Sequence, residues 1–213
     1  MHNWPCGVAL CLEDISGRCP QTPWQAADLA AVQDALSHIA EFDAPPTLPT
    51  VQQVAELDGW QAIAADPEGV DRAVLQRLSG LLEDEKHAQS AMSGERLVHF
   101  DIRADNVLVR EDATAVIVDW SSACRGAGWL DSLLLALDCA VQGGPAPDEV
   151  LSAARPAKSV APERLRCVVA ALSGYFADHA RRPTPPGLPT VRERQRHCAA
   201  AALTWHDNSR IWN

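Results

Sequence analysis

The most constraining feature of the chain is a group of polar side chains at fixed spacing within residues 97–120. His99, Asp101 and Asn106 follow the pattern His-x-Asp-x-x-x-x-Asn, and Asp119 comes directly after a later apolar segment. These side chains have little packing role, and their oxygen and ring-nitrogen atoms are groups that can act on a ligand. Their order and spacing therefore indicate a functional site.

The segments between these residues predict a β-hairpin. Residues 107–109 and 115–118 are apolar, rich in β-branched side chains and flanked by polar ones, which is typical of short strands. A turn at residues 110–113 would reverse the chain between them. The reversal would bring Asn106, just before the first strand, close to Asp119, just after the second. Oxygen-bearing side chains would then gather at one end of the hairpin.

This set of side chains is the one that phosphoryl transfer requires. A carboxylate such as Asp101 can accept the proton of an attacking hydroxyl, while an amide oxygen and a second carboxylate, Asn106 and Asp119, can hold Mg²⁺ against nucleotide phosphates. The pattern is the protein-kinase signature in a looser form. The alternative is a polar loop with a capped turn, since Asp and Asn are common in both.

Composition excludes several other classes of protein. The chain has 213 residues, of which 47% are hydrophobic, so it can bury a full core. The formal net charge of -10 argues against a nucleic-acid binder, which usually presents a basic face. There is no signal peptide, no apolar run long enough for a membrane span, and no Cys-x-x-Cys among the seven cysteines. We therefore expect a soluble, cytoplasmic protein with reduced cysteines in or near its core.

Helices are expected over most of the remaining chain. Thr22 and Pro23 suit the N-cap and first position of a helix that runs to about residue 40, and residues 51–57 suit a short one. Asp71 would begin a longer helix to about Gln89, with the charged residues 83–86 as its solvated end. Further helices are predicted at residues 129–141, 147–154, 162–181 and 190–212. The expected fold is α+β and mostly helical, around one small hairpin.

Four stretches of the sequence resemble the aminoglycoside phosphotransferase (APH) family, whose members are relatives of the protein kinases. Residues 97–106 (Leu-Val-His-Phe-Asp-Ile-Arg-Ala-Asp-Asn) resemble the catalytic loop of that family. Residues 116–120 (Val-Ile-Val-Asp-Trp) resemble its metal-binding motif, with Trp in place of the kinase Phe. Residues 126–135 resemble the stretch that follows, and residues 185–192 a common tail of bacterial members. The fold implied is a protein-kinase-like C-terminal lobe.

The resemblance implies a role for each residue that matches a family motif. Asp101 would be the base that orients and deprotonates the acceptor hydroxyl. Asn106 and Asp119 would hold Mg²⁺ at the phosphates of ATP. His99 would support the metal-binding loop. Asp131 would cap the helix that follows and hold the catalytic loop in place.

The resemblance also implies that little of the N-terminal β-lobe of the family is present. Leu12, Glu13 and Asp14 resemble the hinge that contacts adenine. Residues 1–15 would thus be a remnant of the small-lobe strand and hinge, and residues 16–213 the large lobe. The Gly-rich loop and phosphate-binding Lys would precede the hinge, where the sequence offers Gly7 and no Lys. We expect ATP binding to be weakened, the chain alone to be weak or inactive, and the uncovered face to favour self-association.

Three classes of function are compatible with these patterns. The leading one is ATP-dependent phosphoryl transfer to a hydroxyl of a small molecule, such as an aminoglycoside, a sugar or an amino alcohol, with the acidic balance faintly favouring a cationic substrate. The second is a non-catalytic pseudoenzyme or binding module that keeps the large-lobe fold. The third is a helical structural or interaction protein in which the spacing of Asp101, Asn106 and Asp119 arose by chance.

Overall fold

The computed structural model describes residues 12–212 as a mostly helical chain with two small antiparallel sheets. The helices are α1 (Ala26–Ile39), α2 (Val51–Val54), α3 (Gly59–Ala65), α4 (Arg72–Leu75), α5 (Leu78–Met92), α6 (Leu130–Val141), α7 (Pro147–Ala153), α8 (Pro162–Arg181) and α9 (Val191–Asn208). Short 3₁₀ helices are η1 (Ala104–Asn106), η2 (Trp120–Ser122) and η3 (Arg155–Ala157). The strands are β1 (Arg96–Val98), β2 (Val107–Val109), β3 (Ala115–Ile117) and β4 (Cys124–Gly126). The predicted α+β, mostly helical class is confirmed.

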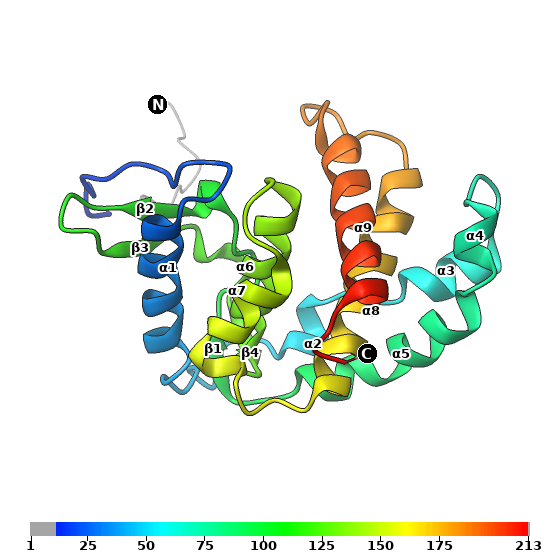
Figure 1. Cartoon of the computed structure of the whole chain (residues 1–213), viewed down its shortest axis with the longest axis horizontal. Coiled ribbons are helices and arrows are strands. Elements are labelled where there is room, and N and C mark those ends of the chain that lie inside the picture. Colours follow the sequence, from blue (N-terminus) through cyan, green and yellow to red (C-terminus); the bar gives the residue numbers. More distant parts are fainter. Residues whose placement is uncertain (1–11, 213) are drawn as a thin grey trace, which may run out of the picture.

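The elements follow a simple order along the molecule. The β2–β3 hairpin and α1 lie at one end, α3 and α4 lie at the other, and α6, α8 and α9 lie between them (Figure 1). None of the helices formed by residues 12–212 is both long and apolar enough to cross a lipid bilayer.

The predicted hairpin is present, and a second pair of strands precedes and follows it in the sequence. In the hairpin, Val107 pairs with Ile117 and Val109 with Ala115. Strands β1 and β4 pair antiparallel, from Arg96 opposite Gly126 to Val98 opposite Cys124. The sequence analysis did not predict this second pair, because each strand has only three residues, too few to show an alternating pattern.

The N-terminal described segment runs along the hairpin edge and is tied to α1. The backbone N–H of Arg18 donates to the carbonyl of Val109 over 3.0 Å, and the Val109 N–H donates back over 2.7 Å. The Arg18 guanidinium donates to both oxygens of the buried Asp28 in α1, which holds the pKa of that carboxyl below its ordinary value. The strand predicted at residues 8–12 lies, except for Leu12, outside the described residues.

Two hydrophobic clusters hold the described chain together. The larger one joins α1, α6, the strands and the inner faces of α8 and α9, and the smaller one joins α3, α5 and α8. Helix α6 is buried almost all round, as its sequence predicted. Four described cysteines are also buried, and burial raises the pKa of the Cys124 and Cys139 thiols to about 12. They therefore behave as small apolar residues at neutral pH.

The charge run at residues 83–86 is not simply a solvated helix end, which corrects the sequence-based expectation. Glu85 is 2% exposed and its carboxylate accepts hydrogen bonds from the backbone N–H groups of Trp60 and Gln61 in the first turn of α3. The α5 residue thus supplies the acceptors that the start of α3 lacks. Glu83 and Lys86 do face solvent and pair with each other.

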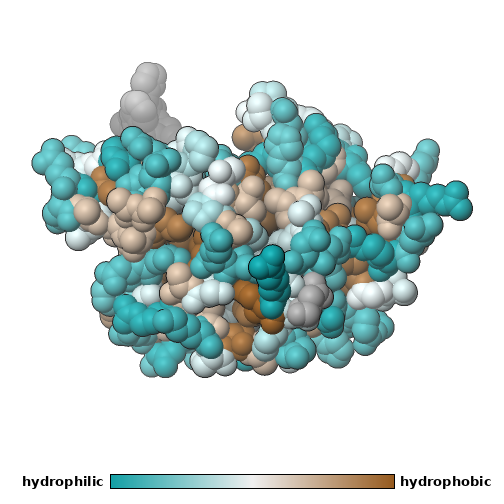
Figure 2. All heavy atoms as spheres, viewed as in Figure 1, coloured by the Kyte–Doolittle hydropathy of each residue, from teal (hydrophilic) through white to brown (hydrophobic). Residues whose placement is uncertain are grey.

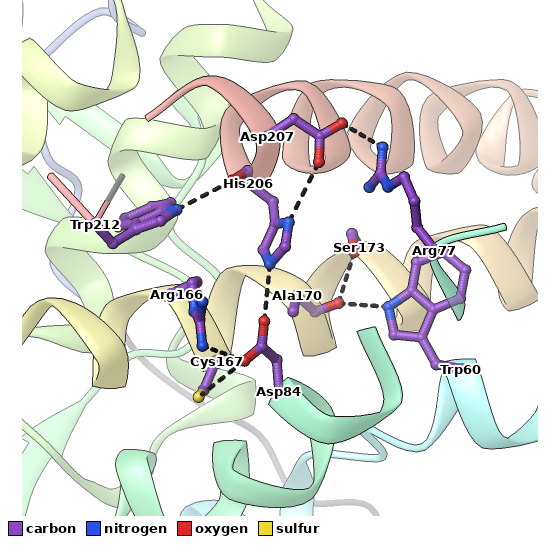
Figure 3. A network of polar contacts seen from close by, with 10 residues as sticks. All are labelled: Trp60, Arg77, Asp84, Arg166, Cys167, Ala170, Ser173, His206, Asp207 and Trp212. Carbon is purple, nitrogen blue, oxygen red and sulfur yellow. Dashed lines mark hydrogen bonds and ion pairs between the residues drawn. The ribbon is translucent and has the colours of Figure 1, made fainter. Parts of the chain in front are cut away.

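Asp84 from the same run joins α5 to α8 and α9 (Figure 3). Its carboxylate accepts from Arg166 over 2.9 Å and lies 3.0 Å from the Nε2 atom of His206. His206 also contacts Asp207, which pairs with Arg77. A buried carboxylate with several partners fixes the relative positions of three helices, since leaving it unpaired would carry a desolvation cost.

Several predicted helix boundaries are wrong. Helix α1 begins at Ala26, because residues 22–24 form a turn that buries Trp24 and lets its indole donate to Asp138. The helix expected from Asp71 to Gln89 is divided into α4 and α5, with Asp71 capping the first through the N–H of Ala73. Helix α2 ends at Val54 and α9 at Asn208, both earlier than expected.

The close crossing of α3 and α8 requires glycine. A Cβ atom on Gly174 would lie 2.6 Å from Cδ1 of the fully buried Trp60. We predict that Gly174→Ala lowers the free energy of unfolding by about 1–3 kcal/mol, because the core must shift to accept the methyl group. Chemical denaturation measures the change.

Gly80→Ala is the matched control for this prediction. Gly80 lies in α5, and a Cβ there would meet no atom within 4 Å. The control should be neutral or stabilising by about 0.5–1 kcal/mol, as expected for Gly to Ala in a helix. Equal stabilities of the two variants would contradict the packing argument.

Candidate active site

The loop that carries Asp101 is held by the buried carboxylate of Asp131. One Asp131 oxygen accepts from the backbone N–H of His99 over 2.8 Å and the other from that of Phe100 over 2.9 Å. Phe100 has a φ of 64°, a left-handed conformation that non-glycine residues rarely adopt. The two hydrogen bonds therefore hold a backbone conformation that the chain would otherwise leave.

Asp131 does not cap the following helix, contrary to the sequence-based expectation. Trp129 is the N-cap residue of α6, and Asp131 lies in its first turn. Its carboxylate is directed to the loop residues 99–100 instead. Burial raises the pKa of Asp131, and the two backbone donors partly oppose that rise.

His99 joins this loop to the end of the hairpin. The ring is fully buried, and its Nε2 atom lies 2.9 Å from the carbonyl oxygen of Val118. Its Nδ1 atom accepts from the backbone N–H of Asp101 over 3.3 Å. This arrangement assigns the proton to Nε2, because Nδ1 must supply a lone pair. The ring also meets Trp120 edge-on, with centroids 4.9 Å apart. His99 thereby positions both Asp101 and the residue before Asp119.

Asn106 is the central connection of the site. Its side chain is buried, and its Nδ2 donates to the Asp101 backbone carbonyl over 2.8 Å and to the Asp101 carboxylate over 3.0 Å. The backbone carbonyl of Asn106 accepts from the backbone N–H of Val118 over 3.0 Å. Both donor positions of the amide serve the loop, which leaves Oδ1 as the free ligand atom.

Asp119 follows directly after Val118 and is exposed to solvent. Its backbone is left-handed, with φ 59° and ψ 65°, at the point where the chain turns from β3 into η2. An exposed carboxylate and an amide oxygen at the same end of a hairpin are hard-oxygen donors of the kind that suit Mg²⁺, which keeps water and substrate phosphates as its other ligands. Within residues 12–212 no three His, Cys, Asp or Glu residues lie together as a metal cluster.

A cavity of about 390 Å³ opens beside Asp101. Its walls come from loop residues 100–103, from residues 54–57 at the end of α2 and just after it, and from helices α6, α8 and α9. Figure 2 shows the molecular surface hollowed between the hairpin side and the α8–α9 end, with hydrophobic residues in the hollow. The carboxylate of Asp101 is 40% exposed, so it is accessible to a bound molecule.

The predicted hinge residues lie apart from this cavity. Leu12, Glu13 and Asp14 are exposed, and none of them lines the cavity. Glu13 lies 3.6 Å from Arg110, at the turn end of the hairpin and thus opposite the end that carries Asn106. The structure therefore brings Asp101 into contact with Asn106 and His99, but it does not bring residues 12–14 into contact with them.

Sequence reasoning missed Asp138, which lies in the wall of the cavity. Its carboxylate accepts from the indole of Trp24 and the N–H of Ala104, and it lies 3.6 Å from Arg194 of α9. Burial raises its pKa, against the effect of these partners. The available signal was a second acid, besides Asp131, in an otherwise mostly apolar helix, because an acidic residue rarely stays buried without partners.

We predict that Asp131→Ala loosens the loop that carries Asp101. The substitution leaves the N–H groups of His99 and Phe100 without their acceptors and should lower the free energy of unfolding by about 2–4 kcal/mol. Amide hydrogen exchange should accelerate at these two residues first. Asp105→Ala, at an exposed position of the same segment, should leave their exchange unchanged. Unchanged exchange in Asp131→Ala would refute the assigned role.

Two comparisons with known proteins bear on the family of the chain. A search of curated proteins finds no match to the chain. The model of the Phosphotransferase enzyme family matches residues 12–167, a region that includes the loop, the hairpin and Asp131. Since this match covers most of the chain, the protein belongs to the phosphotransferase enzyme family.

Proposed function

We propose that the chain transfers the γ-phosphoryl group of ATP to a hydroxyl of a small molecule. The observation that carries the proposal is the placement of Asp101, which is bound to Asn106 on one side and open to a cavity on the other. A carboxylate in that position can face an acceptor hydroxyl while its neighbour faces the phosphates. Family membership supports the same reaction class.

Asp101 would act as the general base. One of its carboxylate oxygens, Oδ2, accepts from Asn106, and the other, Oδ1, lies 3.9 Å from the nearest guanidinium nitrogen of Arg103. Arg103 makes its close, two-pronged ion pair with Asp105 instead. Oδ1 is thus available to orient the hydroxyl and take its proton as the bond to phosphorus forms.

Asn106 and Asp119 would hold Mg²⁺. The Nδ2 contacts of Asn106 fix its amide so that Oδ1 remains as a ligand atom, and the left-handed turn at Asp119 keeps an exposed carboxylate at the same end of the hairpin. Bound there, the ion would supply positive charge to the phosphates. This donor set fits the ion on chemical grounds.

A non-catalytic binding module is the second candidate, and the lysines favour it. The chain has two, Lys86 and Lys158. Lys86 pairs with Glu83 on α5, and Lys158 is exposed after η3. Neither lines the cavity beside Asp101, so residues 12–212 offer no lysine there to neutralise transferring phosphate.

We predict that Asp101→Asn lowers kcat for acceptor-dependent ADP release at least about 100-fold, because the amide cannot accept the proton. Asp112→Asn, the same change at the exposed hairpin turn, should leave kcat unchanged. Both variants should unfold at the parent midpoint. Equal kcat in Asp101→Asn and the parent would contradict the assignment of the base, and no turnover by the folded parent would favour the binding module.

We also predict that Asp119→Ala abolishes the Mg²⁺-dependent part of nucleotide binding. Titration calorimetry with a non-hydrolysable ATP analogue, with and without Mg²⁺, measures that part. The carboxylate is exposed, so its removal should change stability little. The same Mg²⁺ dependence in parent and variant would exclude Asp119 as a ligand.

A further inference from the structure

The cavity beside Asp101 carries information on the acceptor, and the inference drawn from it rests on the proposed phosphotransferase function. Its volume of about 390 Å³ lies at the lower end of the range for small-molecule sites. Much of its wall is apolar and comes from α6, α8 and the loop, including Ile102, Leu137, Leu172 and Phe176. Such a wall favours a compact molecule with an apolar body.

Both arginines of the described wall have an acidic partner, one within the wall and one outside it. Arg194 lies 3.6 Å from Asp138, and Arg103 makes its two-pronged ion pair with Asp105. Two carboxylates remain, Asp101 and Glu56. The cavity therefore offers one acidic group beyond the base.

Glu56 follows α2 and lies at an exposed part of the cavity wall. Burial raises the pKa of the nearby Tyr175 phenol, and the negative charges of Glu56 and Asp101 raise it further, against the opposing positive charges of Arg182 and Arg192. Both carboxylates thus act on the same phenol from within one cavity. A molecule that fills the cavity can therefore meet both the candidate base and a second carboxylate of the wall.

We propose that the acceptor is a compact amino alcohol with an apolar body and a single ammonium group, and that Glu56 is the residue that binds this ammonium group. The hydroxyl lies at Asp101 and the body lies against the apolar wall. A polycationic aminoglycoside is a poor occupant, because its further ammonium groups would be placed against apolar side chains without a partner.

The experiment uses linear amino alcohols from butyl to octyl chains, each paired with the plain alcohol of the same length, and kanamycin as a polycation. Acceptor binding is measured by calorimetry, and phosphoryl transfer by ADP release. We expect amino alcohols of the best-fitting length to bind about fivefold more tightly than their plain partners, which is the effect of a partly exposed ion pair of about 1 kcal/mol.

Glu56→Gln should remove this fivefold preference and leave the plain alcohols unaffected. Glu163→Gln is the matched control, because Glu163 is an exposed acid at the start of α8 that does not line the cavity. It should keep the preference.

The two measurements separate the inference from the function on which it rests. Binding that depends on Glu56 without transfer supports the acceptor class and overturns the proposed activity. Transfer in which plain alcohols or kanamycin equal the amino alcohols, or in which Glu56→Gln keeps the preference, overturns the acceptor class alone. No binding and no transfer with any probe overturns both.

Discussion

The pair of hydrogen bonds from the backbone N–H groups of His99 and Phe100 to Asp131 is the interaction on which the site depends. It holds Phe100 in a left-handed conformation, which sets the direction in which the next residue, Asp101, leaves the loop. The Asn106 amide and the His99 ring then connect this loop to Val118 and to the hairpin end. A single buried carboxylate therefore organises the candidate base and both candidate metal ligands.

Buried carboxylates play a similar part elsewhere in this acidic chain. Asp28 ties the N-terminal described segment to α1, and Asp84 joins three helices. Glu85 accepts backbone hydrogen bonds from the first turn of α3, and Asp138 accepts hydrogen bonds from two distant segments. Each connects parts of the chain that are far apart in sequence, and each has hydrogen-bond partners that offset its desolvation. Part of the negative charge thus serves tertiary structure and gives no guide to the ligand.

The elements that could be predicted were those with local signals. The β2–β3 hairpin follows from two β-branched runs and a turn, and α6 and α8 from long apolar patterns bounded by Gly or Pro. The β1–β4 pair and the buried role of Asp84 depend on contacts across the chain, which local patterns do not contain. The delayed start of α1 has the same cause, since burial of Trp24 against Asp138 outweighs the capping signal at Thr22.

The candidate site was predictable to the extent that it lies on one segment. The spacing of Asp101, Asn106 and Asp119 placed them near the same end of a hairpin, and the structure joins the first two directly. Glu56 and Tyr175 come from residues after α2 and from α8, and their meeting at the cavity depends on how the helices pack. Sequence spacing therefore indicated the proposed reaction, whereas the shape of the cavity beside Asp101 required the tertiary structure.

The pairing of β1 with β4 brings together the two ends of the segment that contains His99, Asp101, Asn106 and Asp119. The chain leaves the helical body at Val98 and returns to it at Cys124, its direct partner. Residues 99–123 thus form one segment whose two ends lie side by side. The helices before and after this segment need not unwind when it opens. Opening it would expose buried residues such as Val107 and Ile117, which belong to the larger hydrophobic cluster. Closure at its two ends and the core beneath it thus hold the candidate site as one unit, so its residues are expected to open together rather than one at a time.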